Sequence, residues 1–355
     1  MATGPTLPFD EPVWELDRRI EELRLSTALD AVAVNKEIRE LERKRDEILS
    51  ALYANLTPWQ QVQLARHPNR PTTLDYVRMM VEDFVELHGD RRFGDDHAIV
   101  AGFGKLDGRR VVVIGHQKGR DTREKLRCNF GMPHPEGYRK ALRVMRLAEK
   151  FHLPVVTLID TPGAYPGVGA EERGEAAAIA ENLLEMARLR TPIISVVTGE
   201  GCSGGAIGIG LADHLALLQY AYYSVISPEG CAAILWKTGE KAAEAAAAMR
   251  LTARDLLELG LIDAVIPEPI GGAHRNPEQM AATLKSAILK TLDALCGMPL
   301  DRLLEARTEK YRRVGVFMEQ GRRIEQALAA RAESEARAQK RAGRRRTLTA
   351  GSTSA

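Results

Sequence analysis

Gly199-Glu200-Gly201-Cys202-Ser203-Gly204-Gly205-Ala206 is the stretch of this chain that says most about its fold and chemistry. It follows the apolar run 193–197 and precedes the small-residue segment 207–211, so it lies where a predicted strand passes into a predicted helix. Glycine and serine at such a junction let backbone N–H groups point into open space, where they can hold a developing negative charge. The stretch therefore predicts a site that stabilises an oxyanion.

The same residues also fit the pattern of a dinucleotide site. Gly199, Gly201 and Gly204 spell G-x-G-x-x-G. A dinucleotide site also needs an acidic residue about 20 positions further on, to hold the ribose hydroxyls. Residues 219–224 contain no acidic residue, so the sequence disfavours this interpretation.

A third interpretation is a serine hydrolase. Gly201, Ser203 and Gly205 spell the G-x-S-x-G of a nucleophile elbow, which requires an acidic residue and then a histidine further along the chain. That order is available in Asp213, Asp263 and His274. Hydrolysis of an ester or thioester through Ser203 therefore stays open as an alternative function.

The composition is that of an ordinary soluble protein. The 355 residues are 45% hydrophobic and 28% charged, and the formal net charge is only +2, which does not indicate nucleic acid or a membrane as a partner. No apolar run approaches the roughly 18–20 residues of a membrane span, and residues 1–21 lack the pattern of a signal peptide. We therefore expect a cytoplasmic protein.

The cysteines and histidines do not predict a metal site. Cys128, Cys202, Cys231 and Cys296 are scattered, without C-x-x-C spacing or a histidine at ligand spacing. The eight histidines are equally dispersed, and we expect a structural role for His116. We expect neither a metal nor a disulfide in this chain.

Hydrophobic periodicity divides the chain into three parts. Residues 1–55 predict a charged helical hairpin, whose apolar stripe packs either on the rest of the chain or on another subunit. Residues 56–299 alternate between strands and helices. Residues 300–355 predict a helical extension that becomes basic and partly disordered.

The central part predicts an α/β fold of repeated ββα units. Asp107-Gly108 between two β-rich runs is a strong hairpin signal, and Pro135 is a favourable first residue for the helix that follows. Pairs of strands that feed a helix indicate stacked ββα units and not a regular doubly wound sheet. The expected strands are 99–106, 110–115, 154–160, 192–197, 215–219, 222–226 and 261–266, and the expected helices are 135–151 and 171–189.

Two further clusters accompany the glycine stretch. The loop 160–167 follows a predicted strand one strand-helix unit earlier, and its prolines and glycines predict a rigid, shaped loop beside the oxyanion site. The segment 116–127 carries five basic residues after another strand. These cations can contact phosphates, or they can form a solvated face or a subunit contact.

Several of these motifs together carry a resemblance to a known family. The chain resembles the alpha subunits of bacterial acetyl-CoA carboxylase carboxyltransferases over residues 9–295. The motifs stand in the order of that family: Leu64-Ala65-Arg66-His67-Pro68, Gly115-His116-Gln117-Lys118-Gly119-Arg120, Asn129-Phe130-Gly131-Met132-Pro133, Ile159-Asp160-Thr161-Pro162-Gly163-Ala164-Tyr165-Pro166-Gly167, Ser227-Pro228-Glu229-Gly230-Cys231 and Ile266-Pro267-Glu268-Pro269.

The resemblance implies a crotonase-like fold and a complete reaction scheme. The family transfers a carboxyl group from carboxybiotin to acetyl-CoA and gives malonyl-CoA, the first committed step of fatty acid synthesis. It acts with a beta subunit that bears the zinc ribbon which this chain lacks. Biotin arrives on a separate carrier protein, and a separate biotin carboxylase uses ATP to carboxylate it. The resemblance therefore implies no ATP site here.

The resemblance also assigns roles to residues. The backbone N–H groups of Gly204 and Gly205 are expected to form an oxyanion hole for the ureido oxygen of biotin, and glycine is expected at both positions because a Cβ would crowd the ligand. The enolate of acetyl-CoA is expected to be held by the beta subunit. Cys202 departs from the family, which more usually has glycine there. The expected biotin pocket is Gly163, Ala164, Tyr165, Pro166, Gly167 and Ser203, and the possible contacts to CoA phosphates are Lys118, Arg120 and Arg127.

Overall fold

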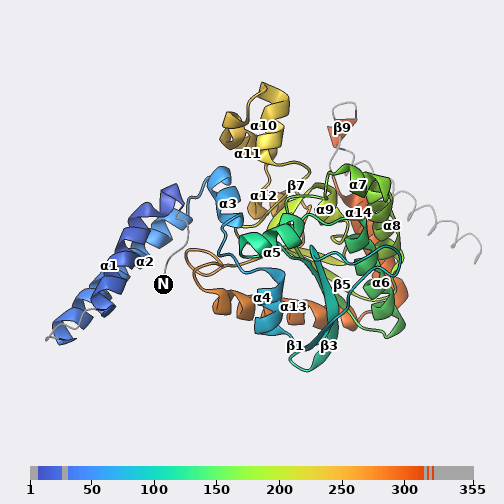
Figure 1. The fold of residues 1–355 in the computed structure, drawn as a ribbon, viewed down its shortest axis with the longest axis horizontal. Helices are drawn as coiled ribbons and strands as arrows, with labels where there is room; N and C mark the ends of the chain where they lie inside the picture. Colours follow the sequence, from blue (N-terminus) through green and yellow to red (C-terminus); the bar gives the residue numbers. More distant parts are fainter. Residues whose placement is uncertain (1–6, 26–30, 316–317, 320–321, 324–355) are drawn as a thin grey trace, which may run out of the picture. The chain divides into compact units, whose positions relative to one another are not determined.

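A mixed sheet of eight strands forms the centre of the described part of the chain (Figure 1). The strand order is β1-β2-β3-β4-β5-β6-β8, and β7 pairs with the far end of β5. The strands β1 to β3 are antiparallel, and the pairs from β3 onward are parallel. Their bounds are β1 Glu82–Glu86, β2 Ile99–Leu106, β3 Arg109–His116, β4 Val155–Thr161, β5 Ile193–Cys202, β6 His214–Leu218, β7 Tyr222–Ser224 and β8 Ala264–Ile266.

The computed structural model describes residues 7–25, 31–315, 318–319 and 322–323. The chain divides into two compact units, Met1–Tyr311 and Arg312–Ala355. In the second unit, β9 (Met318–Glu319) and β10 (Arg322–Arg323) form an antiparallel pair. Most of the predicted basic tail lies outside the described residues. The predicted division of the chain into three parts, after residues 55 and 299, stays a prediction.

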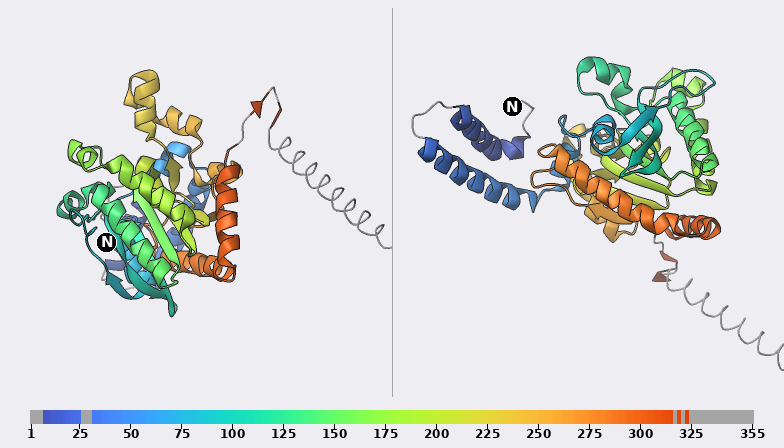
Figure 2. Two further views of the ribbon diagram at one scale, coloured as in Figure 1. Left: turned by 90° about the vertical axis from the view of Figure 1, so that its right-hand side faces the viewer. Right: turned by 90° about the horizontal axis from the view of Figure 1, so that it is seen from below.

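Helices cover the central sheet on both faces, which explains why every residue of β4 and of β5 is buried. In Figure 2, α13 lies along one face, and α6 and α8 lie along the other. The helices are α1 Glu11–Leu25, α2 Ala31–Tyr53, α3 Pro58–Ala65, α4 Thr73–Met80, α5 Thr122–Arg127, α6 Pro135–Lys150, α7 Val168–Glu172, α8 Glu175–Arg188, α9 Ser203–Ile207, α10 Pro228–Trp236, α11 Ala242–Met249, α12 Ala253–Glu258, α13 Pro277–Cys296 and α14 Leu300–Arg313, with short 3₁₀ turns at Pro8–Asp10, Asn129–Gly131 and Gly239–Lys241. No described helix combines the length and the low charge that crossing a membrane requires.

The predicted hairpin at Asp107-Gly108 is confirmed. β2 and β3 pair in full register from Ile99 opposite His116 to Leu106 opposite Arg109. Asp107 and Gly108 have φ angles of 47° and 75°, as a two-residue hairpin turn of this kind requires. The turn therefore places β3 next to β2; on its other side β3 pairs with β4 in parallel, and β3 ends at the basic segment 116–127.

Replacing Gly108 by alanine should destabilise the chain through the backbone alone. An added Cβ there would meet no heavy atom within 4 Å, but an L residue pays about 1 kcal/mol for a left-handed conformation. We expect Gly108→Ala to lower the free energy of unfolding, measured in urea, by that amount. Gly94→Ala is the matched control, because its Cβ also meets open space and its φ is not left-handed. Equal losses in the two variants would contradict this explanation.

Several expected elements have different bounds: the strands expected over 222–226 and 261–266 are shorter, as β7 and β8, and two further differences lie near the site. The single helix expected over 171–189 is wrong, because Gly174 at φ 79° separates α7 from α8. The strand expected to end at Val197 continues to Cys202, since β7 pairs with Glu200, Gly201 and Cys202. Much of the glycine stretch therefore belongs to a strand, and the strand-to-helix junction lies between Cys202 and Ser203.

The expected N-terminal hairpin is present in the described residues as the contacting helices α1 and α2. Their base packs on the rest of the unit: Tyr53 contacts Tyr220 edge to face, with ring centroids 5.6 Å apart. Arg275 adds an ion pair to Asp17 at 2.6 Å. At least this end of the apolar stripe is covered by the chain itself.

The first turns of the C-terminal extension pack on the sheet as α14. The guanidinium of Arg307, which is only 1% exposed, donates to both carboxylate oxygens of Asp213. It also donates to the backbone carbonyls of Met186, Leu189 and Thr191. The ion pair is therefore fully hydrogen-bonded, as a buried charge requires.

Candidate active site

The predicted site lies where β4 and β5 end side by side. These strands are parallel neighbours, and Thr161 pairs with Gly201. The loop 162–167 leaves β4, and α9 leaves β5, so the two segments meet at one edge of the sheet. Ser203, at the turn from β5 into α9, is exposed and has a φ of 53°.

The glycine pair and the loop 163–167 are brought together as predicted. A Cβ on Gly205 would lie 2.5 Å from the carbonyl carbon of Gly163 and 2.9 Å from the backbone nitrogen of Ala164. A Cβ on Gly204 would lie 3.0 Å from Cδ1 of Ile179. At Gly205 the Cβ would meet backbone atoms, so packing alone requires glycine there, whereas at Gly204 it would meet the end of a flexible side chain.

The first turn of α9 supplies backbone N–H groups without intrahelical partners. In any helix the first four N–H groups have none, and no side chain caps α9. Partial positive charge therefore gathers at Ser203, Gly204 and Gly205, next to the loop from β4. An oxygen atom that gains negative charge in this position would be stabilised.

The opposite wall is the loop that follows β4. Oγ1 of Thr161 donates to the carbonyl oxygen of Gly163 at 2.8 Å and accepts from its N–H at 3.0 Å. The ring of Tyr165 lies against that of His134, with centroids 4.3 Å apart. The backbone N–H of Tyr165 donates to the carbonyl oxygen of Pro133. The loop is thus held at Gly163 and at Tyr165, and the rigidity expected from its prolines and glycines stays a prediction.

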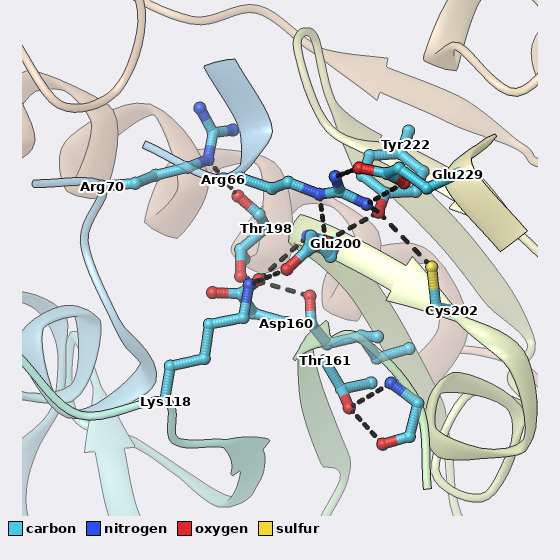
Figure 3. A network of polar contacts seen from close by, with 12 residues as sticks. Arg66, Arg70, Lys118, Asp160, Thr161, Thr198, Glu200, Cys202, Tyr222 and Glu229 are labelled. Carbon is cyan, nitrogen blue, oxygen red and sulfur yellow. Dashed lines mark hydrogen bonds and ion pairs between the residues drawn. The ribbon is translucent and has the colours of Figure 1, made fainter. Parts of the chain in front are cut away.

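A network of buried charges lies behind these two segments (Figure 3). Nζ of Lys118 lies 2.7 Å from Oδ1 of Asp160 and 2.6 Å from Oε2 of Glu200. The same Oδ1 of Asp160 accepts a hydrogen bond from the N–H of Glu200 at 2.9 Å. One lysine from the end of β3 therefore ties the ends of β4 and β5 together.

Arg66, which follows α3, extends this network on the other side of Glu200. Its Nε donates to Oε1 of Glu200 at 2.6 Å, and its Nη1 lies 2.5 Å from Oε1 of Glu229. The hydroxyl of Tyr222 donates to Oε1 of Glu200 at 2.7 Å and accepts the thiol of Cys202 at 3.4 Å. Cys202, where the resemblance leads us to expect glycine, thus lies within β5 and pairs with Ser224.

Burial and charge set the protonation of the network. Burial alone would raise the pKa of Glu200, but Lys118 and Arg66 lower it to about 2. Burial would lower the pKa of Lys118, and the carboxylates of Asp160 and Glu200 raise it instead. Burial raises the pKa of the Cys202 thiol to about 11. At neutral pH Glu200 and Lys118 are charged and paired, and Cys202 is a neutral thiol.

His116 lies beneath the site as a neutral ring. It is fully buried, at 0% exposure, and burial lowers its pKa to about 3. The backbone of Gly205 and of Leu158 lies near the ring and partly offsets this effect, although no well-aligned hydrogen bond to either ring nitrogen is present among the described residues. The expected structural role of His116 is consistent with this position.

The three cations expected near CoA phosphates have different surroundings. Lys118 is engaged by the two carboxylates described above. Arg120 is 58% exposed and pairs with Asp75 at 2.5 Å. Arg127 is exposed at the end of α5. Arg120 and Arg127 therefore remain accessible to a phosphate, whereas Lys118 holds the strand ends.

The residues of the hydrolase alternative are not brought together. Asp213 pairs with Arg307, and Asp263 pairs with Lys310. His274 lies against His67, with ring centroids 4.0 Å apart, and burial lowers its pKa to about 2. None of these three residues forms a hydrogen bond with Ser203 in the part of the chain that the structure describes, so no triad is present there.

The sequence did not predict the buried network. Arg66, Lys118, Asp160 and Glu200 are far apart in the chain and meet only in the folded sheet. One available signal was that Asp160 and Glu200 each stand near the end of a predicted strand, where neighbouring parallel strands bring their carboxyl ends together. Among the described residues, no group of three or more potential metal ligands is present.

Solved structures share this fold. Transcarboxylase 12S, crystallised with methylmalonyl-coenzyme A and methylmalonic acid, aligns with a TM-score of 0.54 at 20% identity, over 65% of this chain and 42% of that one. A Pseudomonas malonate decarboxylase hetero-tetramer in complex with coenzyme A aligns with a TM-score of 0.52 at 19% identity, over 70% of this chain and 93% of that one. The protein therefore has the predicted crotonase-like α/β fold.

Sequence comparison identifies the family more closely. The model of acetyl co-enzyme A carboxylase carboxyltransferase-like proteins matches residues 6–315. The acetyl-coenzyme A carboxylase carboxyl transferase subunit alpha of Geobacter metallireducens is 56% identical over 319 residues, 90% of this chain and 100% of that protein. The protein of the same name from Thioalkalivibrio sulfidiphilus is 58% identical over 313 residues, 88% of this chain and 98% of that protein. The chain belongs to this family of carboxyltransferase alpha subunits.

Proposed function

We propose that this chain is the alpha half of a biotin-dependent carboxyltransferase. The enzyme transfers the carboxyl group of carboxybiotin to acetyl-CoA and gives malonyl-CoA, the first committed step of fatty acid synthesis. Family membership over nearly the whole chain supports the reaction. The observation that carries the proposal is the packing of the first turn of α9 against the loop at Gly163, which leaves unpaired N–H groups beside a fixed pocket wall.

The residues of this site fit a polar carbonyl group that gains negative charge. Carboxybiotin supplies the carboxyl group to be transferred. The N–H groups of Gly204 and Gly205 donate to its ureido oxygen, and Tyr165, fixed by His134, presents a flat surface to the ring. Removing one such donor typically costs roughly 3–4 kcal/mol of barrier.

The surrounding side chains favour an electrostatic role for the protein. His116 is neutral and buried, and Glu200 is held as a carboxylate by Lys118 and Arg66. Neither is placed to exchange a proton near neutral pH. The chain's main contribution is therefore fixed backbone dipoles and not a side-chain nucleophile or base.

The remaining parts of the scheme belong to partners. The beta subunit completes the active site and holds the second oxyanion, because this chain offers a single glycine pair of this kind among its described residues. A biotin carrier protein delivers carboxybiotin, and a biotin carboxylase supplies it. Arg120 and Arg127 are the candidates in this chain for the CoA phosphates. The cytoplasmic location expected from the sequence stays a prediction.

The test is carboxyl transfer from malonyl-CoA to free biocytin, with the full chain alone and with its beta partner. We expect transfer only when both chains are present. Full activity of the alpha chain alone would contradict a site shared between the two subunits.

Ser203→Ala separates this function from thioester hydrolysis. If backbone N–H groups stabilise the oxyanion, the transfer rate of the variant with its beta partner should fall by less than about tenfold. The same variant should also leave any slow release of CoA from malonyl-CoA unchanged. Loss of a partner-independent hydrolysis in Ser203→Ala would instead identify a serine nucleophile.

A further inference from the structure

A basic groove of about 520 Å³ lies along α6, away from the residues assigned above. Its walls come from α6, from the turn at residues 90–92 and from Glu181 of α8. Six cationic side chains line it, against the two carboxylates Asp90 and Glu181. The cations are Arg91, Arg92, Arg139, Arg143, Arg146 and Lys150.

The helix period explains why these cations gather. The four from α6 are spaced by four, three and four residues, which places them on one face of a helix. The opposite face of α6 is buried against the sheet. The turn that carries Arg91 and Arg92 is closed by Asp90, whose Oδ1 accepts three backbone N–H groups. Arg143 joins helix and turn by donating to the carbonyl oxygen of Gly89 at 3.0 Å.

Most of this positive charge has no carboxylate partner. Within the described residues, Arg146 pairs with Glu181 and Glu185 at 3.4 and 3.5 Å. The other five cations of the groove form no such ion pair there: Arg91 and Arg139 donate to backbone carbonyls, and Lys150 lies over the ring of Phe151. Elsewhere on the described chain some exposed arginines do pair with carboxylates. The groove instead leaves five cations without a carboxylate partner close together.

The concentration of positive charge in the groove affects Arg143. Burial and the nearby charge of Arg91 lower the pKa of Arg143, even though Asp95 and Asp90 partly offset them. An anion in the groove would relieve this repulsion. The groove also has an apolar floor, from Leu142 and Leu147, and its volume is that of a small-molecule site.

We propose that this groove binds a small molecule carrying two or more phosphate groups. Five of its six cations are arginines, whose planar fork of donors matches phosphate oxygens two at a time. A concave site with an apolar floor fits a phosphorylated small molecule better than a flat protein face or an extended polymer. The proposal does not depend on the proposed function. The phosphates belong either to acetyl-CoA or to a separate ligand.

The test is isothermal titration of the full chain, with its beta partner, by sodium tripolyphosphate at an ionic strength of about 100 mM. The groove variant is Arg92→Glu/Lys150→Glu, which alters two exposed side chains that make no hydrogen bond or ion pair with the rest of the described chain. The control is Arg254→Glu/Arg302→Glu, which makes the same change of net charge outside the groove. We expect saturable binding that weakens at least about tenfold in the groove variant and little in the control.

The absence of saturable binding, or equal weakening in both variants, would overturn the proposal. Repeating the titration with saturating acetyl-CoA distinguishes the two sources of phosphate. If acetyl-CoA displaces tripolyphosphate, and the groove variant raises the KM for acetyl-CoA, the groove holds the phosphates of that substrate. If binding is unchanged and the KM is unaffected, the groove holds a separate phosphorylated ligand. Both results uphold a phosphate site.

Discussion

Gly205→Ala is expected to reduce carboxyl transfer by about 10²–10³-fold, the loss seen when one oxyanion donor is displaced. The added Cβ would lie 2.5 Å from the carbonyl carbon of Gly163 and 2.7 Å from its oxygen. Backbone atoms on both sides must then move, because no side chain is there to rotate away. The movement separates the first turn of α9 from the pocket wall. Transfer to biocytin with the beta partner present measures the loss.

Gly204→Ala is the matched comparison within the same turn. Its Cβ would meet Cδ1 of Ile179 at 3.0 Å, which is the far end of a flexible side chain. Rotation of Ile179 relieves this contact, so we expect a smaller loss than in Gly205→Ala. Thermal unfolding of both variants checks that the chain is still folded. An equal loss of activity in the two variants would show that the approach of Gly163 is not the cause.

Local signals in the sequence correctly predicted the hairpin of β2 and β3, the start of α6 and the strand β4. Asp107-Gly108 fixes its hairpin through backbone conformation, and Pro135 marks the start of α6, so each needs only its neighbours. The apolar run 154–160 likewise corresponds to β4, which is shifted by one residue. Such elements depend on contacts near in sequence or on simple burial.

The errors arise where a distant segment decides the structure. The glycine stretch continues β5 to Cys202 because Tyr222, Tyr223 and Ser224 pair with it. No local pattern in residues 199–202 indicates that partner. The break between α7 and α8 is different, because Gly174 itself was a visible signal that the helical pattern outweighed.

For the candidate site, too, the local motifs were predicted and the contacts between distant residues were not. The glycine pair and the loop 163–167 can be read from the chain, since each is a local motif after a strand. The role of Glu200 cannot be read in this way, because its partners Lys118 and Arg66 are 82 and 134 residues away. The resemblance to a family located the motifs containing Arg66 and Lys118, but it assigned Lys118 to the CoA phosphates and gave Glu200 no role.

Lys118→Met should therefore be among the most damaging single changes in this chain. It removes the cation that pairs with Asp160 and Glu200 and leaves two neighbouring carboxylates largely buried. Removing one partner of a buried ion pair typically destabilises a protein by about 3–5 kcal/mol. We expect a loss in this range in urea at neutral pH, and a fall in carboxyl transfer of at least about tenfold, because the ends of β4 and β5 carry the two walls of the site.

The pH dependence of this loss separates a charge effect from a packing effect. Lys118 and Arg66 hold the pKa of Glu200 near 2 against the effect of burial, so wild-type stability from this group is lost only as the pH falls toward that value. Without Lys118 the pKa of Glu200 rises, because Arg66 is then its one remaining cationic partner, and protonation removes excess negative charge at higher pH. The deficit of Lys118→Met should thus be largest at neutral pH and should shrink below about pH 5.

Two further variants test whether the loss comes from charge. Glu200→Gln combined with Lys118→Met removes one of the two carboxylates that have lost Lys118 and should recover part of the lost stability, so the two changes should not be additive. Lys125→Met is the control, because it removes a lysine from the same basic segment that forms no ion pair among the described residues. A deficit that is independent of pH, or one that Lys125→Met reproduces, would mean that Lys118 acts through packing alone and that the charge network does not hold the strand ends together.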